Sequence, residues 1–278
     1  MRARLAAVLG VLIAGCGAAP PLVAGPPTED GPRIVEVATG ASIPFDALID
    51  RLAAARVVYV GERHDRAEDH EVQRAILVAL HTRRPELAVG LEMFSRPYQD
   101  ALDAYVAGSL DEAQLLEQTE WSSRWGFDFA LYRSIVGYAG EHRLPLIALN
   151  APREITRTIA REGLDALDEA TRAALPELDR GSEAHRARVE AALREHPHVG
   201  EAGLERFYAA QLVWDETMAE SVARHDGPML VLAGAMHVAR DAVPERAARR
   251  GAAPFVIVLP EDELPADAAV DYVWLTPR

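Results

Sequence analysis

Residues 57–65 read Val-Val-Tyr-Val-Gly-Glu-Arg-His-Asp, and their character changes abruptly after the fourth residue. Four consecutive β-branched or aromatic residues are typical of a strand that is buried on both faces of a sheet. The glycine and the polar residues that follow end this run. The stretch therefore predicts a buried strand whose carboxyl end carries Glu62, His64 and Asp65.

Further apolar runs of similar length follow along the chain, at residues 87–91, 146–149, 229–232 and 255–258. Long stretches rich in Ala, Glu, Arg and Leu separate them, and this composition favours helices. Buried strands that alternate with helices form parallel sheets. We therefore expect an α/β fold with a central, mostly parallel sheet flanked by helices. Residues 34–37 and 272–275 predict additional edge strands.

Two connections are too long to be simple crossovers between strands, namely residues 95–143 and 153–226. Each is helical in composition. They predict a helical insertion or cap lobe over one end of the sheet. Residues 163–197 are highly charged and rich in alanine, which indicates a solvated pair of helices.

The chain begins with the features of an export signal. A basic start precedes the uncharged residues 5–14, and Ile-Ala-Gly leads directly into Cys16, the only cysteine. This apolar stretch is too short for a membrane span, which requires about 20 residues. We expect residues 1–15 to be a lipoprotein signal peptide and Cys16 to carry the lipid, with palmitate among its acyl chains. The alternative is an ordinary cleaved signal with a cysteine at the junction.

Three regions follow from these features. The signal peptide is followed by residues 16–32, a proline-rich tether that starts at the lipidated cysteine, and residues 33–278 form a single domain. Acyl chains anchor a protein without spanning the bilayer. Residue 17 is Gly, not the Asp that usually retains such lipoproteins at the inner membrane. We therefore expect a lipid-anchored protein of the cell envelope, on the outer membrane and facing the periplasm.

The charge of the chain bears on its partners. Asp and Glu number 43 against 29 Lys and Arg, so the formal net charge is −14, and no basic run occurs. Binding to nucleic acid requires a basic patch or stripe. The composition therefore disfavours DNA or RNA as a partner.

Polar residues follow four of the predicted strands. The strand at 57–60 is followed by Glu62 and His64, and the next three runs are followed by Glu92, then by Asn150 and Arg153, then by His237. Ligands of open α/β sheets bind at the carboxyl ends of the strands. Two imidazoles and two carboxylates at one edge predict either a divalent metal site with ligands Glu62, His64, Glu92 and His237, or an acid/base pair.

The helix expected near residues 201–224 supports the same site. Leu204, Tyr208, Gln211, Asp215, Met218 and Val222 lie at alternating steps of four and three, which places them on one helical face. Gln211 and Asp215 interrupt an otherwise apolar stripe, and buried polar groups require partners. They face the same polar cavity, or they pair with a backbone loop and have no chemical role.

Aromatic residues and histidines elsewhere have simpler interpretations. Residues 121–129 concentrate aromatic side chains, as either a core cluster or the wall of a ligand site. The remaining histidines lie on polar helical stretches, and we predict that they are surface residues, with His70 as the reserve candidate for the site. They are His70, His81, His142, His185, His196, His198 and His225.

The chain resembles the ChaN-like family of haem-binding lipoproteins, a branch of the Tiki superfamily that also includes TraB and erythromycin esterase-like proteins. Six motifs carry the resemblance, in order and over the whole predicted domain: Gly61-Glu-Arg-His-Asp65, Gly90-Leu-Glu-Met-Phe94, Trp125-Gly-Phe-Asp128, Asn150-Ala-Pro-Arg153, Gln211 with Trp214-Asp-Glu-Thr-Met-Ala219, and Gly234-Ala-Met-His237.

The resemblance implies an envelope-anchored protein that acts in haem or iron acquisition. It also implies non-covalent haem held between two protomers as a homodimer, and an outer-membrane haem receptor as a partner. Tyrosine or histidine is a reasonable axial ligand for ferric haem. Tyr105 and Tyr132, in the predicted helical insertion, are the tyrosines to test first.

An enzyme is the second hypothesis, because Tiki-like and esterase-like relatives use similar Gly-x-x-His and Glu positions for hydrolysis. In a metal-dependent version the ion activates water, Glu62 or Glu92 is the general base, and Arg153 stabilises negative charge. A metal-free version uses His64 as the base. A third interpretation is a scaffold in which the polar residues only fix the strand ends.

Overall fold

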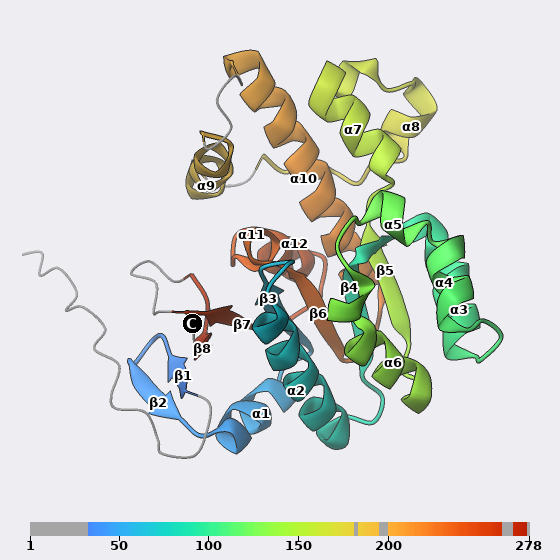
Figure 1. Ribbon diagram of the computed structural model, residues 1–278. Coiled ribbons are helices and arrows are strands. Elements are labelled where there is room, and N and C mark those ends of the chain that lie inside the picture. Colours follow the sequence, from blue (N-terminus) through green and yellow to red (C-terminus); the bar gives the residue numbers. More distant parts are fainter. Residues whose placement is uncertain (1–32, 181–182, 195–199, 263–268, 277–278) are drawn as a thin grey trace, which may run out of the picture.

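A computed structural model describes residues 33–180, 183–194, 200–262 and 269–276 of the chain (Figure 1). Eight strands form one sheet in the order β2-β1-β8-β7-β3-β6-β4-β5. The six from β8 to β5 are parallel, and β1 and β2 are antiparallel additions at one edge. The bounds are β1 Arg33–Glu36, β2 Ala41–Ile43, β3 Val57–Glu62, β4 Ala88–Ser95, β5 Leu146–Asn150, β6 Met229–Gly234, β7 Phe255–Glu261 and β8 Tyr272–Leu275. The predicted mostly parallel sheet is confirmed.

Helices cover both faces of the sheet (Figure 1). They are α1 Phe45–Ala53, α2 Ala67–Arg83, α3 Gln99–Val106, α4 Glu112–Gln118, α5 Trp121–Arg124, α6 Arg133–His142, α7 Arg153–Glu162, α8 Glu169–Ala173, α9 Glu183–Arg194, α10 Glu201–Arg224, α11 Ala235–Val238 and α12 Val243–Arg249, with 3-10 turns η1 Arg96–Tyr98, η2 Phe129–Leu131 and η3 Leu164–Ala166. None of the helices in the described ranges is long and apolar enough to cross a membrane.

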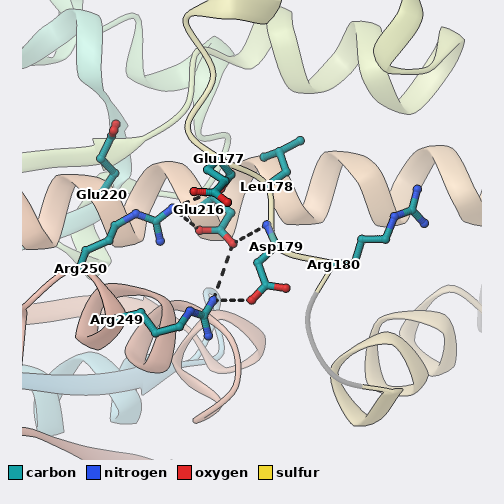
Figure 2. Close-up of a pocket in the computed structure, with 8 residues that line it drawn as sticks. All are labelled: Glu177, Leu178, Asp179, Arg180, Glu216, Glu220, Arg249 and Arg250. Carbon is teal, nitrogen blue, oxygen red and sulfur yellow. Dashed lines mark hydrogen bonds and ion pairs between the residues drawn. The ribbon is translucent and has the colours of Figure 1, made fainter.

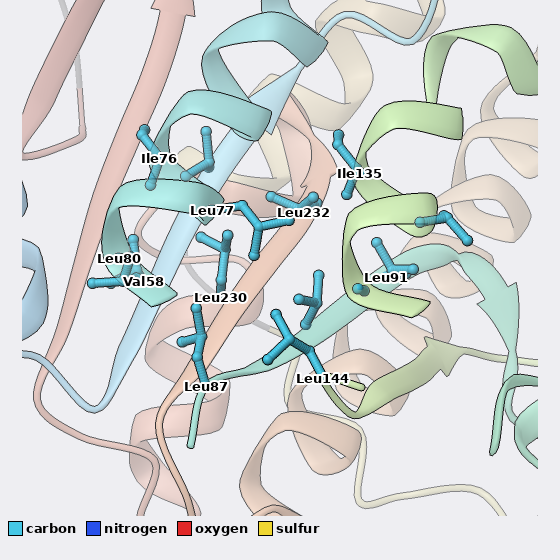
Figure 3. Packing of buried hydrophobic residues seen from close by; sticks show 14 of the residues in the cluster. Val58, Ile76, Leu77, Leu80, Leu87, Leu91, Ile135, Leu144, Leu230 and Leu232 are labelled. Atoms are coloured by element: carbon cyan, nitrogen blue, oxygen red, sulfur yellow. The ribbon is translucent and has the colours of Figure 1, made fainter. Parts of the chain in front are cut away.

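The strand β3 shows why the sheet is buried on both sides. Val58 and Val60 point to one face, where they pack with leucines of β6 and with α2 and α6. Figure 3 shows Val58 in this cluster. Val57 and Tyr59 point to the other face and pack with α10 and α12. Side chains alternate between the two faces of a strand, so the continuous apolar run supplies both hydrophobic cores.

The long connections form the expected helical lobe. The first, between β4 and β5, contains η1, α3, α4, α5, η2 and α6, and the second, between β5 and β6, contains α7, η3, α8, α9 and α10. In α4 the Asp111 side chain accepts from the backbone of Gln114, whose own side chain accepts from the backbone of Asp111.

Two details differ from the sequence-based expectation. The edge strand β2 has only three residues and no buried side chain, so no apolar pattern indicates it. Residues 163–197 are not simply a solvated pair of helices, because α9 packs on α10 through the buried side chains of His185 and Val189. Arg186 of α9 also pairs with Glu205 of α10.

Candidate functional site

Four neighbouring strands deliver the predicted polar residues to one edge of the sheet. The strands β3, β6, β4 and β5 are adjacent and parallel, so their carboxyl ends lie side by side. Glu62 ends β3, Glu92 lies near the end of β4, and Asn150 ends β5. His237 lies on α11, directly after β6. The structure thus brings these residues together.

Glu62 and His64 form the first carboxylate–imidazole pair. Nδ1 of His64 lies 2.8 Å from Oε1 of Glu62, and the carboxylate is buried. The hydroxyl of Tyr132 donates to the same oxygen at 2.6 Å, and Nε2 of Gln73 donates to Oε2 at 2.8 Å. These contacts fix the carboxylate. Because Nδ1–H donates to Glu62, the neutral imidazole keeps its lone pair on Nε2.

The surface prediction is wrong for His70, which lies beneath this pair and is buried. Its Nε2 is 3.2 Å from the carbonyl oxygen of His64, and its Nδ1 is 3.2 Å from Oε1 of Gln73. The first turns of α2 sit directly over the end of β3, which forces polar residues of this helix inward. His70 therefore stabilises the loop that carries His64. This position next to the site agrees with the choice of His70 as the reserve candidate.

Asp215 and His237 form the second pair. Oδ1 of Asp215 lies 2.6 Å from Nδ1 of His237, and Oδ2 lies 2.9 Å from Nε2 of His185. Nε2 of Gln211 is 3.2 Å from Nδ1 of His237. The alternative in which Asp215 pairs only with a backbone loop is therefore wrong. So is the surface prediction for His185, which is buried against Asp215.

Glu92 lies between the two pairs. Its Oε2 accepts from the backbone N–H of Gly234 at 2.6 Å, and its Oε1 is 3.4 Å from Nε2 of His237. Gly234 has no side chain, which lets His64 approach closely: a Cβ there would lie 2.8 Å from Cε1 of the His64 ring. Asn150 donates from Nδ2 to the Glu92 carbonyl at 3.0 Å and thereby joins β5 to this network.

Both imidazoles hold their protons more firmly than an ordinary histidine. Burial lowers the pKa of His237, but the charge of Glu92 and the hydrogen bond to Asp215 outweigh it and raise this pKa to about 9. Burial also opposes the charged form of His64, yet Glu62 and Glu92 leave its pKa raised. Burial would raise the pKa of Asp215, and its hydrogen bonds from His185 and His237 lower it overall. His237 is therefore a cation at neutral pH.

A pocket of about 290 Å³ opens above these groups. Trp125 stands edge-on to His64, with ring centroids 4.8 Å apart, and Trp214 stands edge-on to His237 at 6.4 Å. Arg153 lies exposed at its rim and donates to the Ser123 carbonyl. The full lining is His64, Glu92, Met93, Ser95, Arg124, Trp125, Asn150, Ala151, Arg153, Trp214 and His237.

A larger hollow of about 640 Å³ lies elsewhere, beside α10 and α12 (Figure 2). Its charged walls pair with one another. Nη2 of Arg250 is 2.6 Å from Oε2 of Glu216, and Nη2 of Arg249 is 2.9 Å from Oδ2 of Asp179. The buried side chain of Arg246 also contacts Glu216. These contacts hold α12 against α10, so the charged groups of this hollow have a structural role. The strand-end pocket therefore remains the candidate site.

Comparison with known proteins identifies the family. Residues 48–246 match the family model described as "Haem-binding uptake, Tiki superfamily, ChaN". The chain belongs to this family. Among solved structures, ChaN of Campylobacter jejuni superposes with a TM-score of 0.74 at 19% identity, covering 88% of this chain and 96% of that one. Its structure was described as showing cofacial haem binding.

Two other proteins superpose less closely or match a smaller part of the chain. The type III effector HopBA1 superposes with a TM-score of 0.50 at 12% identity, over 84% of this chain and 92% of that chain. Protein RETICULATA-RELATED 5 of Arabidopsis thaliana, a chloroplastic protein, is 27% identical over 130 residues. The match covers 44% of this chain and only 17% of that protein. The likeness to HopBA1 is one of fold alone.

All six ChaN-like motifs seen in the sequence contribute a residue to the pocket lining. Of the expected ligand residues, Asn150 lines the pocket. Gln211 and Asp215 lie behind His237 and are not part of the lining, and three others lie elsewhere. Asp65 is exposed beyond the end of β3. Tyr105 is partly buried on α3, where its ring packs closely on Gly140 of α6. Tyr132 is not an accessible lobe tyrosine: it is buried, and burial together with the charge of Glu62 raises its pKa, so its hydroxyl stays protonated.

The expected divalent metal has no support in this geometry. Within the described part of the chain, no group of three or more His, Cys, Asp or Glu side chains is arranged to hold a metal ion. The two imidazoles are instead each bonded to a carboxylate through Nδ1. Two residues of this hydrogen-bond network, His185 and Gln73, were not predicted as site residues. His185 bonds Asp215, thirty residues later, and Gln73 bonds Glu62 across the turn between β3 and α2.

Proposed function

We propose that this chain is a haem-binding lipoprotein of the bacterial cell envelope that acts in haem and iron acquisition. The observation that supports haem binding is the match of residues 48–246 to the haem-binding ChaN family. The likeness in fold to the haem-bound ChaN of Campylobacter jejuni agrees with it. The proposal includes a homodimer that shares haem and an outer-membrane haem receptor as the source of the ligand.

The residues present limit where haem fits. The strand-end pocket, about 290 Å³, is at the lower end of the range for pockets that bury small ligands, and a haem macrocycle exceeds it. The hydroxyl of Tyr132 already donates to Glu62. We therefore expect the iron ligand to be an accessible tyrosine or histidine outside this pocket. Bound haem would supply a ferric iron that takes an oxygen or nitrogen ligand.

A haemin titration of the full-length chain tests the proposal. Haemin added to the purified protein in detergent should give a saturable shift of the Soret band, near one haem per chain, that is absent from detergent alone. Size-exclusion chromatography with and without haemin tests the dimer. An unshifted Soret band at every ratio would contradict haem binding.

The envelope location rests on the sequence of the first 32 residues, which lie outside the described residues. Cys16 follows an apolar stretch in the lipoprotein pattern. Metabolic labelling with palmitate should therefore mark the wild-type protein and not Cys16→Ser. Fractionation should place the labelled protein in the outer membrane. Equal labelling of both proteins, or recovery in the inner membrane, would contradict this part of the proposal.

A second candidate function is metal-free hydrolysis, which the two carboxylate–imidazole pairs favour. Nε2 of His64 would take a proton from water as the water oxygen bonds to an ester carbonyl carbon. The carbonyl electrons move onto oxygen, which accepts a hydrogen bond from the His237 cation. When the tetrahedral adduct collapses, the C–O bond breaks and the alkoxide takes the proton from His64. Arg153 at the rim would hold an anionic group of the substrate.

Hydrolysis of a small activated ester such as p-nitrophenyl acetate tests this candidate. Replacing His64 by Gln should lower kcat/KM by about 10²-fold or more, because a positioned general base typically contributes at least this factor to the rate. His225→Gln is the matched control, because His225 is a partly buried histidine at the opposite edge of the sheet. Equal activity of both variants and the wild type would remove the hydrolase.

A further inference from the structure

The rim of the strand-end pocket carries an arginine that has no acidic partner. Arg153 is the first residue of α7, is exposed and lines the pocket. Its guanidinium donates to the Ser123 carbonyl and forms no ion pair with the described residues. The neighbouring Arg124, by contrast, pairs with both Glu120 and Glu154. Arg153 is therefore left as a cation without a paired carboxylate, where α5 and α7 meet.

This positive charge contrasts with the rest of the chain, whose formal net charge is −14. The pocket lining holds the cations Arg124, Arg153 and His237 against one carboxylate, that of Glu92. That carboxylate is already satisfied, because it accepts from the backbone N–H of Gly234 and lies beside His237. An electropositive cleft in an acidic protein concentrates anions and repels cations. The lining therefore favours an anionic ligand.

The walls of the pocket favour a flat and apolar body for this ligand. The Trp125 ring stands edge-on to His64, and the Trp214 ring stands edge-on to His237. Met93 and Ala151 add further apolar surface to the lining. Indole rings present a large apolar surface and pair favourably with other aromatic rings. A ligand that reaches both histidines thus contacts two indoles on the way.

The two polar regions of the pocket lie at different depths. His64 and His237 are fixed by Glu62 and Asp215, whose carboxylates are buried at the strand ends. Arg153 is exposed at the rim. A molecule that contacts the histidines and Arg153 together must carry its charge at the end opposite to its reacting group. A volume of about 290 Å³ restricts it to a small molecule.

We propose that the strand-end pocket takes small, flat esters that carry a carboxylate at the end opposite to the ester, and that Arg153 selects this charge. A guanidinium binds a carboxylate through two parallel N–H···O bonds, which fixes direction as well as charge. The ester carbonyl then lies at His64 and His237, where one water is consumed as the C–O bond breaks. This inference rests on the second candidate function, metal-free hydrolysis.

Calorimetric titration of the full-length chain with 4-acetamidobenzoate tests the ligand class separately from hydrolysis. This anion carries an amide in place of the ester, so it binds without being consumed, and 4-methylacetanilide is its neutral counterpart. The wild type should bind the anion at least about tenfold more tightly than the neutral compound, as for a charged hydrogen bond. Arg153→Gln should lose most of this preference. Arg153→Lys should keep part of it, because the positive charge remains.

Arg157→Gln is the matched control, since Arg157 is exposed one turn later on α7 and does not line the pocket. It should keep the wild-type preference. The inference is overturned if the wild type binds neither compound or both equally, or if Arg153→Gln keeps the full preference for the anion. Thermal unfolding of each variant establishes that it is folded.

Hydrolysis of 4-acetoxybenzoate and of 4-methylphenyl acetate is the second measurement, with each rate divided by the rate in buffer alone. The ratio of the two kcat/KM values should favour the anionic ester in the wild type and fall in Arg153→Gln. A ratio that is the same in both proteins would overturn the role of Arg153. Selective binding of 4-acetamidobenzoate without hydrolysis of either ester is a different result. It would contradict the hydrolase and support the pocket as a binding site for small carboxylates.

Discussion

Asp215 and His237 come from different helices, yet Oδ1 of one lies 2.6 Å from Nδ1 of the other. The carboxylate is fully buried, and its second oxygen holds His185 of α9 at 2.9 Å. Each charged group stabilises the other, so the pKa of Asp215 is lowered and that of His237 is raised. One carboxylate therefore links α9, α10 and α11 beneath the strand-end pocket.

The raised pKa of His237 predicts how stability depends on pH. Its pKa is about 9 in the folded protein against 6.5 for an ordinary histidine, so the folded state binds the proton more tightly. This difference contributes on the order of 3 kcal/mol to the free energy of unfolding. The contribution is complete below about pH 6.5 and is lost as pH rises through about pH 9.

Urea unfolding of the wild type and of His237→Gln between about pH 6 and pH 10 measures this contribution. The variant should be less stable at the acidic end, and the two curves should converge at the alkaline end. His225→Gln should follow the wild type throughout, because burial and Arg56 lower the pKa of His225. Parallel curves for the wild type and His237→Gln would show that His237 is not held as a cation.

His185 should matter for stability through Asp215. In His185→Ala the oxygen Oδ2 of Asp215 loses a hydrogen-bond donor inside the core. An unsatisfied buried acceptor costs about 1 to 3 kcal/mol. The melting temperature of His185→Ala should therefore be lower than that of the wild type. The control is His142→Ala, an exposed histidine for which the melting temperature should stay near that of the wild type. Equal melting temperatures for all three proteins would show that α9 is not anchored by this bond.

Gly234 should be intolerant of even one methyl group. A Cβ there would lie 2.8 Å from Cε1 and 3.0 Å from Nε2 of His64, so Gly234→Ala forces the imidazole to move. If the pocket hydrolyses esters, the misplaced base should lower kcat/KM by about 10²-fold. Gly200→Ala is the control, because a Cβ at Gly200 meets no atom within 4 Å. Full activity of Gly234→Ala would show that His64 need not occupy its observed position.

Local patterns in the sequence predict much of the fold. The β-branched run at 57–60 becomes β3, and residues 272–275 form β8 with the same bounds. The prediction of β8 as an edge strand is wrong, because it pairs with β1 on one side and with β7 on the other. The stripe that includes Gln211 and Asp215 is buried on α10 as its spacing indicates. These features depend on residues close together in the chain, which is why periodicity and composition are enough to predict them.

The errors concern partners that are distant in sequence. His185 lies on a helix rich in alanine and charged residues, and its buried partner is Asp215, thirty residues later. Tyr132 follows a loop in the lobe, and its hydroxyl reaches Glu62, seventy residues earlier. No local pattern specifies such contacts. These contacts form only when the helical lobe packs over the strand ends.

The carboxylate of Glu216 should be among the most sensitive side chains for stability. It is buried and contacts the buried guanidinium of Arg246. It also contacts Arg250 (Figure 2). Glu216→Gln leaves Arg246 without a neutralising charge, which should cost about 3 to 5 kcal/mol. Glu220→Gln, one turn later on the same helix, removes a partly exposed ion pair with Arg96. It should cost about 1 kcal/mol or less, and equal losses for the two variants in urea unfolding would contradict this assignment.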